Sequence, residues 1–159
     1  MFSNMLDLKE NDKIDGWMSL LELLFLYERA KEMDTIVELG SYKGRSTYAL
    51  CSGCNGIVTT IDNFSMSDRQ TLEKNVGHFN NLKIMEGNST DFVRPADMVF
   101  IDAGHTYEAV KADIKAWLPF TKKLICGHDY DLEEVKKAVR ITIDKPNEVI
   151  GSIWCKWIK

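Results

Sequence analysis

Short apolar segments alternate with segments of helical periodicity along most of this chain. Runs rich in β-branched and aliphatic residues predict strands at residues 35–39, 57–61, 82–85, 98–101 and 124–126. A last extended stretch, residues 149–158, is interrupted by Gly151. Apolar residues three or four positions apart predict helices at residues 17–32, 44–51, 67–76, 107–118 and 131–139. The chain therefore has the strand–helix order of an α/β protein.

Several of these helices carry sequence signals for their ends or for their buried face. In the first helix, one set of apolar positions predicts the face toward the core: Trp17, Leu20, Leu21, Leu24 and Tyr27. Ser67 followed by Gln70 predicts a capping box, and Asp131 followed by Glu134 predicts a looser version of the same signal. Pro119 predicts the end of the helix at residues 107–118.

Alternating short apolar strands and helices predict a parallel sheet that is covered on both faces. Right-handed crossovers then give a doubly wound topology. Only Gly151 separates the last two extended pieces, which leaves no room for a crossover helix, so we expect the last strand to run antiparallel. The predicted fold class is α/β, a Rossmann-like and mostly parallel sheet formed by one domain over residues 1–159.

Length and composition narrow the function classes. A chain of 159 residues suits one domain, and its 45% hydrophobic and 28% charged residues argue against a disordered chain. The most apolar stretch, residues 20–27, contains Glu22 and is too short to span a membrane. Charged residues near the N-terminus argue against a secretory signal, so a cytoplasmic protein is expected. A net charge of −4 without a basic stripe argues against a nucleic-acid partner.

The four cysteines are expected to be reduced thiols because nothing marks the chain for export. Cys51 and Cys54 form a C-x-x-C pair, a spacing that also suits a metal or redox pair. A structural zinc site needs two further ligands at matching spacing. Cys126 and Cys155 lie singly among apolar neighbours. Packing is therefore favoured over zinc or redox chemistry.

Polar residues follow the carboxyl ends of five predicted strands, where ligands bind in doubly wound folds. An ordinary structural role explains any one of these residues, whereas five strand ends together indicate one ligand site. The polar and glycine residues of interest are Glu38, Gly40, Ser41 and Gly44 at the end of the first strand, Asp62 at that of the second, Asn88 and Ser89 at that of the third, Asp102 and His105 at that of the fourth, and His128 and Asp129 at that of the fifth.

The first two strand ends indicate the kind of ligand. Gly40 and Gly44 form G-x-x-x-G rather than the G-x-G-x-x-G of dinucleotide folds, which disfavours a pyrophosphate. Asp62 lies 22 residues after Gly40, where a carboxylate commonly accepts hydrogen bonds from ribose. Glu38 ends a buried strand and needs a partner, which a cationic ligand would supply. A plain tight turn and a helix-capping Asp62 are the alternatives. A ribose-bearing cation without pyrophosphate suggests S-adenosylmethionine.

Four segments of the chain resemble the successive motifs of class I S-adenosylmethionine-dependent methyltransferases. They are VELGSYKGRSTYAL, TIDNF, MVFIDAGHTYEAVKADIKAWLP and ICGHDYDLEEVKKAV. The sequence is similar in particular to the small O-methyltransferase-like group that includes macrocin-type and cephalosporin-hydroxylase-like proteins. The resemblance extends over residues 16–158.

The resemblance implies a role for each matching position. Around the methionine part of the cofactor it places Glu38, Gly40, Ser41, Gly44 and Ser46. Asp62 would hold the ribose, and Asn63 would flank the adenine. Asn88 and Ser89 would reach the adenine edge, although relatives often have an acidic residue near Asn88. Asp102 would lie near the transferred methyl group.

Some members of this group bind a divalent metal such as Mg²⁺ or Mn²⁺ through carboxylates after the fourth and fifth strands. Asp102 and Asp129 match those positions, and His128 stands where relatives carry another acidic residue. Magnesium favours oxygen ligands, so His128 indicates a softer ion. A loop histidine and a helix-capping Asp129 are the structural alternatives, but Asp131 is the better cap.

His105 is a candidate general base or a surface histidine at a helix start. Trp17 and Met18 match a segment that covers the active site in relatives, and core packing is the alternative. Few insertions separate the core elements, so residues 1–15, as a mobile lid or arm, the segment after Asp62, or a second subunit would close the site. A homo-oligomer is therefore expected.

These observations predict a methyltransferase that uses S-adenosylmethionine, with Asp102 and His105 as catalytic residues. The acceptor is expected to be a small hydroxylated molecule, methylated on oxygen with help from a divalent metal at Asp102, His128 and Asp129. Two alternatives stay open. The chain is a non-catalytic module that binds the same cofactor, or a metal-dependent enzyme of another reaction type on the same fold.

Overall fold

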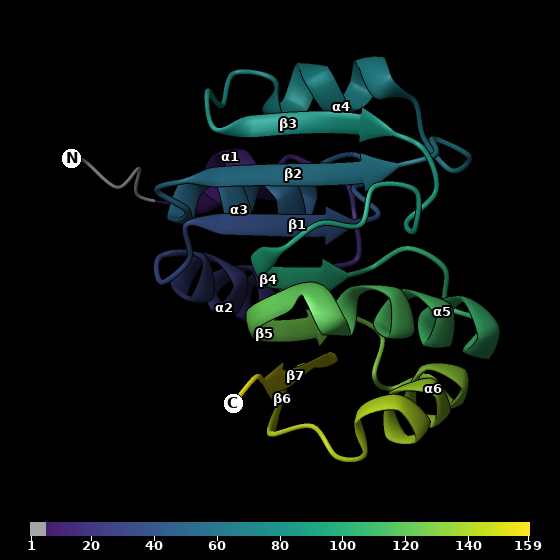
Figure 1. Ribbon diagram of the computed structural model, residues 1–159. Helices are drawn as coiled ribbons and strands as arrows, with labels where there is room; N and C mark the ends of the chain where they lie inside the picture. Colours follow the sequence, from purple (N-terminus) through teal and green to yellow (C-terminus); the bar gives the residue numbers. More distant parts are fainter. Residues whose placement is uncertain (1–5) are drawn as a thin grey trace.

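The structure is a computed structural model, and it describes residues 6–159. The described residues form one seven-stranded sheet of order β3-β2-β1-β4-β5-β7-β6 (Figure 1). The strands are β1 (Thr35–Leu39), β2 (Ile57–Asp62), β3 (Leu82–Glu86), β4 (Ala96–Ile101), β5 (Thr121–Gly127), β6 (Glu148–Ile150) and β7 (Ile153–Trp157). Each lies within about three residues of a strand that the apolar runs predicted.

The first five strands pair in parallel, and β7 pairs antiparallel with both β5 and β6. This confirms the predicted fold class and the antiparallel last strand. Gly151 takes a left-handed backbone conformation (φ +59°) in the turn between β6 and β7, which allows the chain to reverse without a helix. Strand order reverses between β1 and β4, so their carboxyl ends open a crevice between them.

Helices cover both faces of the sheet (Figure 1). On one face α2 and α3 pack on alternate sheet residues such as Ile36, Met98 and Phe100, whereas α5 and α6 pack on their neighbours Val37 and Val99. The helices are α1 (Leu8–Asp12), α2 (Leu20–Ala30), α3 (Arg45–Gly53), α4 (Arg69–Val76), α5 (Tyr107–Trp117) and α6 (Glu133–Ile143), with a 3₁₀ turn η1 (Leu118–Phe120).

The core-facing side of α2 differs from the predicted one. Trp17 precedes the helix and is 75% exposed, and Leu20, Leu21 and Leu24 are exposed as well. The buried side instead consists of Glu22, Leu23, Leu26, Tyr27 and Ala30. The predicted face consisted of apolar residues alone and left out Glu22, but a buried hydrogen-bond network satisfies this carboxylate. Hydrophobic spacing alone did not distinguish the two faces.

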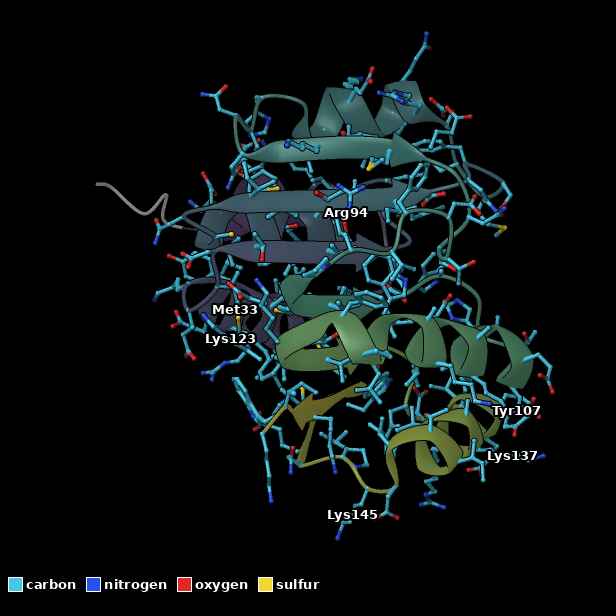
Figure 2. All side chains as sticks on the ribbon, in the orientation of Figure 1. Met33, Arg94, Tyr107, Lys123, Lys137 and Lys145 are labelled. Carbon is cyan, nitrogen blue, oxygen red and sulfur yellow. The ribbon has the colours of Figure 1, made fainter. Side chains whose placement is uncertain are left out.

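Two predicted caps are also wrong. The side chain of Asp68, not Ser67, caps α4 by accepting a hydrogen bond from the Thr71 amide. Asp131 does not cap α6, which begins after Leu132 without a side-chain cap. Helix α6 is held against α5 at the surface, where Lys137 lies over the Tyr107 ring at 4.8 Å (Figure 2).

All four cysteines are free and buried, which supports the packing interpretation. Cys126 and Cys155 face each other in the register of β5 and β7, and Cys54 donates to the Met33 carbonyl. No helix in residues 6–159 has the length and apolar character needed to cross a membrane.

Gly40 permits the close contact between the ends of β1 and β4. Its φ is +86°, and a Cβ atom there would lie 2.3 Å from the backbone oxygen of Asp102. We predict that Gly40→Ala lowers the free energy of unfolding by about 3 kcal/mol, because the new methyl group must push β4 away in a strained backbone conformation. Urea unfolding measures this loss.

Gly104→Ala, in the facing loop, is the matched control. A Cβ atom there would contact only the Ala109 side chain, and Gly104 has no left-handed backbone. It should therefore cost much less stability, and equal losses in the two variants would contradict the assigned role of Gly40.

Candidate active site

A cavity of about 650 Å³ lies at the carboxyl ends of the parallel strands. It brings together eleven of the residues that the sequence predicted: Gly40, Ser41, Ser46, Asp62, Asn63, Asn88, Ser89, Asp102, His105, His128 and Asp129. Trp17 and Met18 also line it. The size is within the usual range for sites that hold small ligands.

Asp62 shapes the cavity by holding the loop that follows β1. Its Oδ2 atom accepts hydrogen bonds from the amides of Ser41 and Tyr42 at 2.9 and 3.0 Å. Tyr42 has a left-handed backbone (φ +50°), and the two amides converge on the carboxylate there. Oδ1 accepts from the Phe64 amide at 2.7 Å and has capacity for a further donor. Asp62 can therefore hold the loop and contact a ligand together.

Glu38 and Gly44 do not line the cavity, although both were predicted to bind the cofactor. Glu38 is fully buried beneath the loop and accepts from the Ser46 hydroxyl at 2.5 Å and the Thr47 hydroxyl at 2.6 Å. Burial raises the pKa of its carboxyl to about 7, although the hydrogen bonds from these two hydroxyls act to lower it. Gly44 permits close packing of the start of α3 against Leu72 of α4.

Arg45 holds the segment that precedes α2 over one side of the cavity. Its guanidinium donates to the backbone oxygens of Ile14 and Met18 at 2.8 and 3.0 Å and to the Asp12 carboxylate at 2.9 Å. The segment presents Trp17 to the cavity, with its ring centroid 5.0 Å from that of Tyr42. Met18 is part of the hydrophobic core as well, so it both covers the cavity and packs in the core.

The adenine-side candidates differ in what their side chains do. Asn88 lines the cavity, and its backbone N–H donates to the Asp91 carboxylate at 2.8 Å. The hydroxyl of Ser89 instead bonds the buried Asp113 of α5, and the Ser89 carbonyl accepts from the Trp117 indole at 2.8 Å. Ser89 thus anchors the wall of the cavity to α5.

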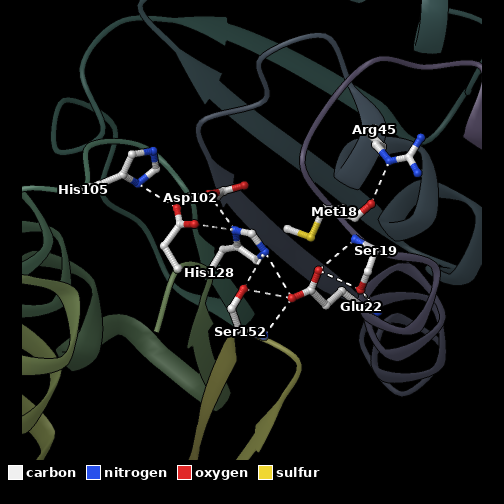
Figure 3. A network of polar contacts seen from close by, with 9 residues as sticks. Met18, Ser19, Glu22, Arg45, Asp102, His105, His128 and Ser152 are labelled. Carbon is white, nitrogen blue, oxygen red and sulfur yellow. Dashed lines mark hydrogen bonds and ion pairs between the residues drawn. The ribbon is translucent and has the colours of Figure 1, made fainter. Parts of the chain in front are cut away.

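A chain of charged groups crosses the other side of the cavity (Figure 3). His105 Nδ1 lies 2.9 Å from Asp129 Oδ2, and Asp129 Oδ1 lies 3.2 Å from His128 Nδ1. The other nitrogen of His128, Nε2, lies 3.2 Å from Glu22 Oε1 and 2.9 Å from the Ser152 hydroxyl. Asp102 Oδ1 lies 3.8 Å from His128 Nδ1.

A family model described as a methyltransferase domain matches residues 37–130, more than half of the chain. The chain belongs to this methyltransferase-domain family. The matched residues hold β1 to β5 and the cavity-lining loops that follow these strands. A search of the curated proteins found no match.

Solved structures share the fold of this methyltransferase domain. An O-methyltransferase from Bacillus cereus in complex with SAH is 17% identical with a TM-score of 0.71, and the match covers 96% of this chain and 88% of that chain. Cofactor-bound Rv0187 from MTB is 21% identical with a TM-score of 0.66, and the match covers 86% of this chain and 73% of that chain. The O-methyltransferase TomG from Streptomyces achromogenes, in complex with SAM, is 17% identical with a TM-score of 0.63. That match covers 80% of this chain and 68% of that chain.

The charges of the network compensate one another. Burial disfavours a charged His128, but hydrogen bonds to Asp129 and Glu22 outweigh it and hold the pKa of the imidazole well above its usual value. Hydrogen bonds from His105 and from His128 hold the pKa of the Asp129 carboxyl below its usual value. Burial raises the pKa of Asp102, and the nearby Asp129 adds to this rise. The methyltransferase domain therefore places a cationic ring among three acids.

The donor atoms of Asp102, His128 and Asp129 fit a divalent metal. One ligand atom from each lies within 4.8 Å of the others. The set is two carboxylates and one imidazole, which suits a borderline ion better than magnesium. His128 Nε2 faces a carboxylate, as in many metal-bound histidines, so Nδ1 is the nitrogen that a metal would take in place of its proton.

Sequence reasoning missed several residues at this site. Glu22 and Ser152 come from elements outside the motif segments that resemble methyltransferases. The Ser19-x-x-Glu22 spacing is a capping-box signal and would have placed Glu22 at a helix start, but not beside His128. Arg45 lies within the glycine motif, where a basic residue has no signal of its own. Met66 lines the cavity from the loop after β2.

The buried Glu38 gives a prediction about stability and pH. Its folded-state pKa is raised from 4.5 to about 7, so its contribution favours folding below pH 4.5 and is lost as pH rises through 7. Replacing it with neutral Gln removes this dependence. We expect the free energy of unfolding of Glu38→Gln, relative to that of wild type, to rise by about 2 kcal/mol from pH 5 to pH 7.5.

Urea unfolding at both pH values measures this difference. Glu86→Gln, at the exposed end of β3, is the control for replacing a glutamate at the surface, and it is measured at the same two pH values. A Glu38→Gln difference that does not change with pH would contradict the burial argument.

Proposed function

We propose that this methyltransferase domain transfers a methyl group from S-adenosylmethionine to a hydroxyl oxygen of a small acceptor. The observation that carries the proposal is the His105–Asp129 pair on the wall of the cavity that Asp62 and the glycine loop also line. A loop suited to a nucleoside and a base suited to a hydroxyl thus share one space. The SAM and SAH complexes of the similar structures support this cofactor.

S-adenosylmethionine, when bound, supplies a methyl group on a positively charged sulfur. Asp62 Oδ1 has the free acceptor capacity that a ribose hydroxyl would use, and Asn63 and Asn88 lie beside it on the cavity wall. Asp102 lies on the cavity wall, and a cation beside its carboxyl group would favour the ionised form that attracts the cation. We place the methionine end near Ser41 and Asp102 on this basis.

His105 is the residue we assign as base. Asp129 accepts a hydrogen bond from the Nδ1–H group, which leaves Nε2 able to take the proton of an acceptor hydroxyl. The side chain is 52% exposed, so an acceptor can reach it. In a transfer, the acceptor oxygen would bond the methyl carbon as the carbon–sulfur bond breaks with its electron pair remaining on sulfur, and His105 would take the acceptor proton.

A divalent metal would be held by Asp102, His128 Nδ1 and Asp129, as the donor set indicates. Such an ion would act as a Lewis acid that makes an acceptor hydroxyl more acidic. The protein's own part is to hold the three ligands at one edge and to keep the oxygen, methyl carbon and sulfur in line.

The rim indicates what the acceptor carries besides its hydroxyl. Trp17 is 75% exposed and Met66 is 77% exposed, and both line the cavity together with Leu132. Apolar side chains of this size gain free energy by covering an apolar ligand surface. We therefore propose an acceptor with an apolar body, bound between the Trp17 segment and the loop after β2.

The first test is cofactor binding measured by calorimetry. Wild type should bind S-adenosylmethionine, and Asp62→Ala should weaken this by about tenfold or more, because it removes the ribose acceptor and releases the loop amides. Asp34→Ala, an exposed position just before the amino end of β1 and outside the cavity lining, is the control. A wild-type protein that binds neither S-adenosylmethionine nor its demethylated product would refute the proposed cofactor.

The second test is methyl transfer to a panel of hydroxylated aromatic and aliphatic compounds. With an acceptor found, we expect His105→Ala to lower kcat by about 10²-fold or more and to leave cofactor affinity close to the wild-type value, since the base acts only on the acceptor. Full activity in this variant would exclude His105 as base. Cofactor binding without transfer to any compound would favour the non-catalytic alternative.

A further inference from the structure

Glu22 is a buried carboxylate that the mechanism above does not use. It is 4% exposed and lies in the first turn of α2. Its Oε1 atom accepts from the Ser152 amide at 2.8 Å and the Ser152 hydroxyl at 2.9 Å. Its Oε2 atom accepts from the amide and hydroxyl of Ser19 at 2.8 and 2.9 Å. The carboxylate is therefore fixed at both oxygens before it contacts His128.

This fixed carboxylate determines how the His128 ring lies (Figure 3). Glu22 Oε1 and the Ser152 hydroxyl both face Nε2, so the ring cannot turn over without losing two contacts. Nδ1 then points toward Asp129 and Asp102. A carboxylate beside Nε2 keeps the proton on that nitrogen. When a metal cation replaces the proton on Nδ1, the lone pair of Nδ1 is therefore the one that binds the cation.

We propose that Glu22 is a positioning residue that makes His128 a nitrogen ligand, and thereby makes the centre prefer a borderline transition-metal ion to Mg²⁺. The inference rests on the metal site included in the proposed function. Without a fixed nitrogen donor, the centre would consist of two carboxylates, a set that suits Mg²⁺. With it, the centre gains a donor that Co²⁺ or Zn²⁺ binds more strongly than Mg²⁺ does.

A purely structural role for Glu22 makes a different prediction. Glu22 completes the capping box of α2 and contacts the β6–β7 turn at Gly151, so its loss would lower stability in either case. A structural role would not change which metal binds. Metal selectivity therefore separates the two roles, and it can be measured without any methyl acceptor.

The probe is Co²⁺, which is added to metal-free protein and detected by its visible absorption bands. The affinity for Mg²⁺ is obtained from its competition with Co²⁺. We expect wild type to bind Co²⁺ more tightly than Mg²⁺. Glu22→Gln should weaken Co²⁺ binding by about 10- to 100-fold, as loss of a histidine's outer partner commonly does. Mg²⁺ affinity should change less, so the Co²⁺/Mg²⁺ preference falls.

Ser19→Ala is the matched control because it removes the other half of the capping box and leaves Glu22 beside His128. It should lower thermal stability about as Glu22→Gln does, with Co²⁺ affinity unchanged. His128→Asn gives a second route to the same comparison. In that background Glu22→Gln should have no further effect on Co²⁺ affinity, because Glu22 acts through the ring.

Equal loss of Co²⁺ affinity in Ser19→Ala and Glu22→Gln would overturn the inference. So would a wild-type protein that binds Mg²⁺ as tightly as Co²⁺, or that binds neither ion. These results would leave the proposed methyl transfer standing, since calorimetry with S-adenosylmethionine and the acceptor panel test it separately.

Discussion

The contact between the ends of β1 and β4 is the constraint on which the site depends. These neighbouring parallel strands send their chains to opposite faces of the sheet, and the crevice opens between the two departing loops. The Gly40 backbone touches the Asp102 carbonyl, and the Asp102 amide donates to Leu39. A wider gap would separate the loop after β1, which holds the Asp62 contacts, from the groups that follow β4 and β5.

The site also requires several ionisable groups to share this edge of the sheet without destabilising the folded protein. Buried carboxylates are tolerated when donors meet their oxygens. Glu38 has two hydroxyl donors, Asp62 has three backbone amides, and Glu22 has two serines and a histidine. The same donors that stabilise these acids also fix their directions, so the cavity is preorganised before any ligand enters.

Much of the fold could be predicted from the sequence because its signals are local. Strand residues 35–39 and 57–62 are short apolar runs that end at polar residues, and the glycine turn after β1 carries its own motif. Parallel topology then brings those ends together, which is why eleven predicted residues line one cavity. Local pattern failed where a polar residue is buried by a distant partner. Glu22 faces inward because Ser152 and His128 satisfy it, and neither is near it in the sequence.

Glu38 does not line the cavity, although the sequence anticipated its burial. An acid at the end of a buried strand needs a partner, and the sequence suggested a cationic ligand. The chain supplies the partner itself through Ser46 and Thr47, in the first turn of α3. Glu38 thus ties the start of α3 to β1, whereas Asp62 ties the preceding loop to β2. The two acids hold opposite sides of one loop, and only Asp62 lines the cavity where a ligand would contact it.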